Sequence, residues 1–111
     1  MKTLVRNALA AVVALPVIAA AQVPEKVAVC AACHGQNGQA VQPIYPHLAG
    51  QYSNYIRQAL RDYRAGVRKN PVMGAQAASL SDADIEQLAE YFSAQPSPLY
   101  TPGVHGAGAK H

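Results

Sequence analysis

The sequence predicts a small all-α domain, and three observations lead to this fold class. The chain has 111 residues, which is enough for one domain. Apolar residues recur at helical spacing in three stretches, and no stretch of useful length alternates between apolar and polar residues. Leu, Ile, Val and Phe make up under a fifth of the residues after Ala21. A domain with so small a core needs an additional cross-link or bound group to be stable.

The first segment is typical of a secretory signal peptide. Met1–Asn7 contains Lys2 and Arg6, and the uncharged stretch Ala8–Ala21 ends in three alanines. We expect residues 1–21 to be removed by cleavage after Ala21, so that the protein works in the periplasm. An uncleaved anchor or a buried helix is the alternative, but the apolar run is shorter than the roughly 20 residues that span a bilayer. After cleavage we expect no stable membrane insertion.

The net charge excludes a strongly basic nucleic-acid binder. It is +3 at pH 7 and falls to +1 when Lys2 and Arg6 are removed with the signal peptide. We therefore expect no nucleic-acid partner. The chain length likewise excludes a large multidomain enzyme.

The sequence predicts three helices. The first starts at Pro24, a residue suited to a first helical position, and continues to His34. The second is Tyr52–Ala65, which has an apolar face and ends at Gly66. The third is capped by Ser81, with Asp84 three residues later, and stops before Pro96. Residues 35–50 and 66–80 are predicted as loops, residues 22–95 as the domain, and residues 96–111 as a flexible tail rich in Pro and Gly.

Both cysteines lie in the motif Cys30-Ala31-Ala32-Cys33-His34, which has four interpretations. A thioredoxin-like redox pair requires strands, and the chain predicts none. A structural zinc site requires more ligands at paired spacing. A disulfide leaves His34 without a role. Attachment of one c-type haem uses all three residues: the thiols of Cys30 and Cys33 form thioethers, and His34 binds the iron. Export also favours haem, because bacterial haem attachment occurs outside the cytoplasm.

The second axial ligand is predicted to be Met73, the single methionine after residue 21. Its predicted location is the loop 66–80, between Pro71 and Gly74. A lone methionine is commonly core filler, which is the alternative here. Three histidines could compete with Met73 for the iron: His47, His105 and His111. His47 is the more serious rival, because the other two lie in the predicted tail.

The chain resembles the small bacterial monohaem class I cytochromes c. The resemblance covers nearly all of residues 22–95 and is carried by Cys30–Gly35, Gly38, Tyr45–Gln51, Gly66, Arg68, Asn70–Met73 and Leu80–Phe92. It implies three to five helices wrapped around one covalently bound haem, with the first and last helices crossing. It also implies axial ligation by His34 and Met73. The carbonyl of Pro46, or of Pro43 if the register differs, then accepts a hydrogen bond from His34.

A haem would compensate for the small core, because apolar side chains can pack around it. We expect Tyr52, Tyr55 and Arg68 as weaker candidates for hydrogen bonds to the haem propionates. Tyr63 and Tyr91 are interpreted as ordinary packing residues. The expected lining is Tyr45, Tyr52, Tyr55, Ile56, Leu60, Val72, Leu88 and Phe92.

With both axial positions filled, the iron has no open site for oxygen chemistry, and the predicted function is one-electron transfer rather than catalysis. The predicted donors are a dehydrogenase or a quinol-oxidising complex, and the predicted acceptors are an oxidase or a reductase. One alternative is a dedicated haem subunit of one periplasmic dehydrogenase. A second alternative is a haem sensor or enzyme with His34 as sole protein ligand.

Basic and acidic residues are separated along the sequence. Arg57, Arg61, Arg64 and Arg68 form one stripe if the second helix continues past Gly66, whereas the acids of the third helix form a second group. A solvated face is the ordinary interpretation of such a run. The functional interpretation is a stripe that steers the protein toward an acidic partner.

Overall fold

The computed structural model describes residues 22–100 and the single residue Ala14. This part of the chain contains four helices and no strand: α1 (Val27–His34), α2 (Ser53–Ala65), α3 (Pro71–Ala77) and α4 (Asp82–Ser93). The prediction of an all-α fold is therefore confirmed. None of these four helices is long and apolar enough to cross a membrane. Nearly all of the predicted signal peptide, and residues 101–111 of the predicted tail, lie outside the described residues.

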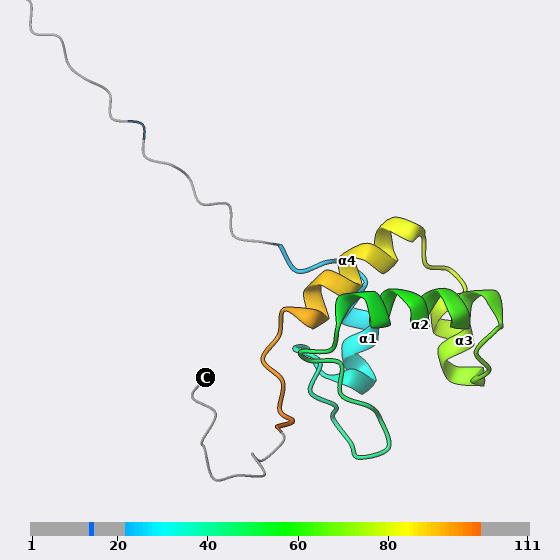
Figure 1. Ribbon diagram of the computed structural model, residues 1–111, viewed down its shortest axis with the longest axis horizontal. Coiled ribbons are helices and arrows are strands. Elements are labelled where there is room, and N and C mark those ends of the chain that lie inside the picture. The colour runs from blue at the N-terminus through cyan, green and yellow to red at the C-terminus, as the bar shows by residue number, and fades with distance from the viewer. Residues whose placement is uncertain (1–13, 15–21, 101–111) are drawn as a thin grey trace, which may run out of the picture.

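Helix α2 is the central element of the domain. Helix α4 lies alongside it, and α3 packs against it near its C-terminal end, whereas α1 lies near its N-terminal end (Figure 1). The buried core joins the first and last helices, as the resemblance implies. Its members come from α1, α2 and α4 and are Val27, Ile56, Leu88, Ala89 and Phe92.

The signals that predicted the ends of the second and third helices are present in the structure. Gly66 ends α2 in the left-handed conformation, with φ 72°, which a glycine adopts without steric cost. Ser81 and Asp84 form the predicted capping box at the start of α4. The first helix begins later than predicted. Pro24 forms a turn instead, because its carbonyl accepts a hydrogen bond from the Val27 N–H at 3.0 Å.

The prediction of a loop over residues 66–80 was wrong, because α3 lies within it and carries Met73. Asn70 caps this helix: its Oδ1 accepts hydrogen bonds from the N–H groups of Val72 and Met73, both at 3.0 Å. Pro71 takes the first helical position, where no N–H is needed. The helix is therefore determined by its N-terminal cap rather than by an apolar face.

The predicted arginine stripe was also wrong, because the two groups of charges pair with each other. Helix α2 ends at Ala65, so Arg68 does not continue its face. The arginines of α2 form ion pairs with the acids of α4: Arg57 with Glu86 and Glu90, Arg61 with Glu86, and Arg64 with Asp82. Pairs at the surface contribute little each, but together they fix α4 alongside α2. They also pair three of the four arginines of the stripe that was considered for steering a partner.

Residues 35–50 form a turn-rich segment that is closed by hydrogen bonds. The carbonyl of Gly38 accepts from the N–H groups of Leu48 and Ala49, at 2.7 and 3.1 Å. Gly38 has φ 80°, and a Cβ at this position would lie 2.6 Å from the backbone nitrogen of Ala49. Only glycine fits this close approach. The end of the segment, at Leu48 and Ala49, therefore lies beside Gly38 near its beginning.

This segment is also attached to α4. The Tyr91 hydroxyl donates to the Gln36 carbonyl at 2.8 Å. The Gly50 N–H donates to the Phe92 carbonyl at 3.0 Å. Ser97 packs against Gly50, so the packed part of the chain continues past the predicted domain boundary at residue 95.

Candidate functional site

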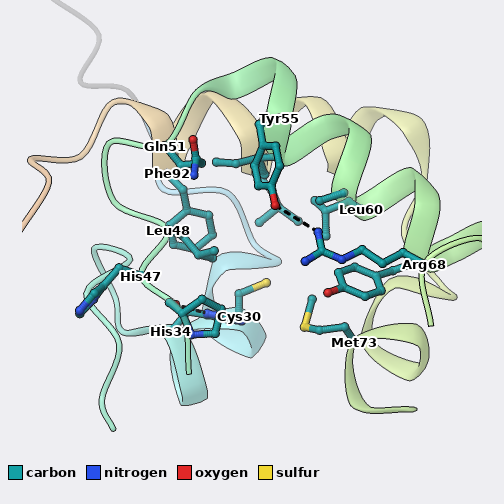
Figure 2. A pocket seen from close by; sticks show the side chains of 15 residues that line it. Cys30, His34, His47, Leu48, Gln51, Tyr55, Leu60, Arg68, Met73 and Phe92 are labelled. Atoms are coloured by element: carbon teal, nitrogen blue, oxygen red, sulfur yellow. Dashed lines mark hydrogen bonds between the residues drawn. The ribbon is translucent and has the colours of Figure 1, made fainter. Parts of the chain in front are cut away.

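A cavity of about 210 Å³ lies between α1, α2 and α3. Helix α1 contributes Cys30 and His34, helix α2 contributes Tyr55 and Leu60, and helix α3 contributes Met73 (Figure 2). Most of the exposed surface of this cavity is apolar. A second cavity of about 140 Å³ shares the side chains of Cys30, Leu60 and Met73.

His34 is held in a defined orientation at the end of α1. Its side chain is buried, with 7% of its surface exposed. Nδ1 lies 2.8 Å from the carbonyl oxygen of Pro46, the hydrogen bond that the resemblance implied. Because Nδ1–H donates to this carbonyl, Nε2 keeps its lone pair and is available to bind a metal ion.

Both cysteines are free, half-buried thiols. Cys30 lines the cavity, and burial raises the pKa of its thiol. Cys33 is not among the lining residues. It lies beside Tyr45, and a hydrogen bond with Cys33 raises the pKa of the tyrosine. A spacing of three residues on α1 places the two thiols on successive turns.

The structure bears on the competing interpretations of the cysteine motif. Cys30 and Cys33 are not joined in a disulfide. The described residues contain no strand that could form a thioredoxin-like unit. Within the same part of the chain, no group of three or more His, Cys, Asp or Glu side chains is placed to hold a metal ion. His105 and His111 lie outside the described residues.

Met73 lies across the cavity from His34. Figure 2 shows its thioether sulfur on the cavity side of α3, facing the wall that carries Cys30 and His34. Its side chain is half-buried. The structure thus brings the two predicted axial ligands to opposite walls of one cavity.

The aromatic residues of the site differ from those expected. Tyr55 lines the cavity as predicted. Tyr52 does not: it precedes α2 and is 80% exposed. Tyr45 and Val72 also lie outside the lining. Tyr63, interpreted from sequence as a packing residue, lines the cavity instead.

Several lining residues were not predicted, and some left a signal in the sequence. Tyr55, Ala59 and Tyr63 are spaced by four residues and so share one face of α2. His47, which was considered from the sequence as a rival ligand of the iron, also lines the cavity. Gln51 comes from the same segment around Pro46 and has no comparable pattern. The Nδ1 of His47 accepts a hydrogen bond from the Ala40 N–H at 2.9 Å.

The residues present fit a covalently bound haem. One imidazole nitrogen and one thioether sulfur face the cavity from opposite walls, and two free thiols stand one turn apart on α1. These are the ligand types of c-type haem proteins. The remaining surface is apolar, as a flat aromatic macrocycle requires, and includes Leu48, Ile56, Leu60, Leu88 and Phe92.

The cytochrome c family model matches residues 20–95 of the chain. The chain belongs to the cytochrome c family. More narrowly, it is a small class I cytochrome c with one covalently bound c-type haem. Electron transport is the function of such proteins. Their fold, all-helical around one haem, is the fold described above.

Relatives of this cytochrome differ in length. Cytochrome c-554(548) of Halomonas halodenitrificans is 43% identical over 74 residues, which cover 64% of this chain and 89% of that protein. The thiosulfate dehydrogenase electron acceptor of Thiomonas intermedia is 41% identical over 91 residues, which cover 80% of this chain and 42% of that protein.

A solved structure shows the same difference in length. The structure of cytochrome c4 from Acidithiobacillus ferrooxidans matches with a TM-score of 0.55 and 38% identity. The match covers 65% of this chain and 39% of that one. The chain therefore spans less than half the length of two of these three proteins.

Proposed function

We propose that this cytochrome is a one-electron carrier of the periplasm in which His34 and Met73 are the two axial ligands. The observation that carries this proposal is the position of Met73. Its sulfur faces the cavity from the wall opposite His34. A bound haem supplies a one-electron change between ferric and ferrous iron.

The protein's own side chains favour electron transfer over catalysis. His34 is oriented by Pro46, so its Nε2 presents one lone pair in a fixed direction. A haem held by both His34 and Met73 would have no position left on its iron for oxygen or peroxide. The apolar lining, with Leu60 and Phe92, would cover the faces of a bound haem. Thioether ligation also favours the reduced state, which suits a carrier.

Redox proteins are the partners of this carrier. As donors we propose a dehydrogenase or a quinol-oxidising complex, and as acceptors an oxidase or a reductase. The similarity to proteins named thiosulfate dehydrogenase electron acceptors supports a dehydrogenase as donor. It also favours the second candidate function, a dedicated haem subunit of one such dehydrogenase. A stable complex that co-purifies with the cytochrome identifies the subunit, and its absence identifies the free carrier.

The proposed location follows from the sequence of the first segment. We propose that residues 1–21 direct export and are removed after Ala21. Mass spectrometry of the secreted holoprotein measures this directly. A mature chain that begins at Gln22 supports the proposal, and an intact Met1–Ala21 segment contradicts it.

The ligation is tested by the visible spectrum of the ferric holoprotein and by Met73→Ala. Wild type should show the weak red band of sulfur bound to ferric iron. The variant should keep its haem, lose this band and bind carbon monoxide in the ferrous state. The reduction potential should fall by about 0.1–0.2 V, a fraction of the range of about 0.8 V that axial ligands span.

Val72→Ala is the matched control, since Val72 lies on the same helix, is 60% exposed and does not line the cavity. Its spectrum should equal that of wild type. A high-spin spectrum in wild type would identify an open iron site and so favour the sensor or enzyme with His34 as sole ligand. A sulfur band that survives Met73→Ala contradicts the assignment of Met73.

A further inference from the structure

Arg68 makes three contacts that attach the connection between α2 and α3 to the body of α2. Its backbone N–H donates to the Asp62 carbonyl at 3.1 Å. Its side-chain Nη1 donates to the Tyr55 hydroxyl at 3.3 Å. Its guanidinium carbon lies 4.8 Å from the centre of the Tyr63 ring, a cation–π distance. Figure 2 shows this guanidinium between α2 and the wall that carries Met73.

The rest of this connection offers α2 little else to hold it. Residues 66–70 are all exposed. A Cβ on Gly66 would meet no atom within 4 Å, and Val67 is 74% exposed. The side chain of Asn70 bonds forward to α3 rather than back to α2. Along residues 66–70, Arg68 is thus the residue whose side chain makes a hydrogen bond and a cation–π contact with α2.

We infer that Arg68 is a positioning residue, which fixes the connection leading to α3 and thereby keeps the Met73 sulfur at its place in the cavity. This inference rests on the proposed ligation by Met73. Without the contacts of Arg68, the connection becomes more mobile, and α3 can shift away from His34 while remaining helical. The ligand on the α3 wall then dissociates more often.

A purely electrostatic role of the same side chain makes a different prediction. Arg68 lines the cavity, so its charge can also act on an anionic group there. Such a role changes the reduction potential and leaves the dissociation of Met73 unaffected. A lysine, which keeps the charge, would then replace Arg68 fully. A lysine cannot stack its planar group on Tyr63 and reach Tyr55 at once, so under the positioning role it replaces Arg68 only in part.

The test measures how fast cyanide binds to the ferric holoprotein, because cyanide enters only when Met73 has left the iron. In Arg68→Ala this rate should rise about ten-fold, which corresponds to about 1.4 kcal/mol. Arg68→Lys should fall between Arg68→Ala and wild type. Lys69→Ala is the matched control: it removes a charge from the neighbouring position, and its rate should stay within about two-fold of wild type.

Two further variants keep the test decisive if Arg68→Ala yields no holoprotein. Tyr55→Phe removes the hydroxyl that accepts from Arg68, and Tyr63→Leu removes the ring under it. Each should raise the cyanide rate by about two- to five-fold, in line with the loss of one weak contact. The inference is overturned if neither variant changes the rate, if Arg68→Ala stays within two-fold of wild type, or if Lys69→Ala has the same effect.

The wild-type spectrum separates this inference from the proposed function. If the wild-type spectrum lacks the sulfur band, the proposed ligation by Met73 is contradicted, and so is the inference that rests on it. If wild type shows the band and Arg68→Ala binds cyanide at the wild-type rate, only the positioning role of Arg68 is contradicted.

Discussion

The wall of the cavity that carries His34 is tied to the domain at several points, whereas the wall that carries Met73 is held at few. His34 is buried and bonded to Pro46, and the segment that contains Pro46 is anchored on α4 through Tyr91 and Gly50. Met73 is half-buried on a helix of 7 residues. That helix packs against α2 and is reached through an exposed connection.

This difference assigns different tasks to the two proposed ligands. The histidine side combines the covalent attachment of the haem with the hydrogen bond from His34 to Pro46, so we expect it to stay in place when the iron changes oxidation state. The methionine side depends on the cap of a short helix and on the attachment of its connection. We expect the region around Met73 to open locally at a lower free energy than the region around His34, because fewer buried contacts hold it. We therefore expect the iron to lose Met73 long before it loses His34.

The largest effect should come from the cysteines, which lie on the same helix as His34. In Cys30→Ala and Cys33→Ala, the holoprotein should fall about ten-fold or more, because a thioether is lost and the small core depends on haem. Haem staining of mature protein measures the loss. The haem-free chain should also lack a cooperative melt. Cooperative melting of a haem-free preparation, close to that of the holoprotein, would contradict this expectation.

A pair of glycines compares the two walls directly. Gly38→Ala, on the His34 side, should destabilise the holoprotein by about 2 kcal/mol or more, because φ is +80° and the Cβ would meet Ala49. Gly74→Ala, on α3, meets nothing closer than the Tyr63 carbonyl at 4.0 Å. It should stabilise the protein by about 0.5–1 kcal/mol, since alanine is the better helix former. Denaturant unfolding measures both, and equal signs for the two variants contradict the comparison.

Loss of the α3 cap should act on the Met73 wall alone. Asn70→Ala removes the acceptor of two N–H groups and should cost about 1 kcal/mol. Cyanide should bind faster to the ferric variant, whereas the covalent attachment should be unchanged. Asn54→Ala is the control, because the side chain of Asn54 also accepts a backbone hydrogen bond near a helix N-terminus, but that helix is α2 and the donor is the Tyr55 N–H. If the two variants bind cyanide equally fast, the cap does not hold Met73.

The smallest effect should come from protonation of Asp82, the first residue of α4. A hydrogen bond with Arg64 lowers the pKa of Asp82. The folded state thus favours the carboxylate, and its stabilisation, present above the unfolded pKa of about 3.9, is lost as the pH falls through the lower folded pKa. Asp82→Asn should lower the melting temperature only slightly at pH 7, because the ion pair with Arg64 is exposed to solvent. Between pH 5 and pH 3, the free energy of unfolding should fall less in the variant than in wild type. An equal fall in both proteins would contradict the contribution of Asp82 to the pH dependence.

Features coded by adjacent residues could be predicted from the sequence. The motif at Cys30–His34 is contained in one helix, so the haem attachment could be identified without a structure. The ends of α2 and α4 are determined by Gly66 and by Ser81 with Asp84, and these signals act within one turn. The role of Met73 as a candidate ligand followed from its being alone after residue 21.

Features that depend on the path of the chain could not be predicted. Helix α3 has no apolar periodicity, and its signal, Asn70 before Pro71, is short enough to be overlooked inside a loop. Tyr52 and Tyr63 both belong to the predicted second helix, but Tyr52 precedes α2 and is exposed, whereas Tyr63 lines the cavity. The pairing of Arg57 with Glu86 joins residues far apart in sequence, so the separated charges gave no indication of their contact.

The bonds of Arg64 have a consequence for how this protein opens. Arg64 donates to the Leu80 carbonyl at 2.9 Å and pairs with Asp82 at 2.6 Å, so it joins the two ends of residues 65–81. A segment closed at its base can exchange between ordered and open forms at a small entropic cost, because its ends stay together. We therefore expect residues 65–81 to open as a separate cooperative unit within the domain. Amide hydrogens of α3 should exchange with solvent through this local opening, while those of α2 and α4 exchange only through global unfolding.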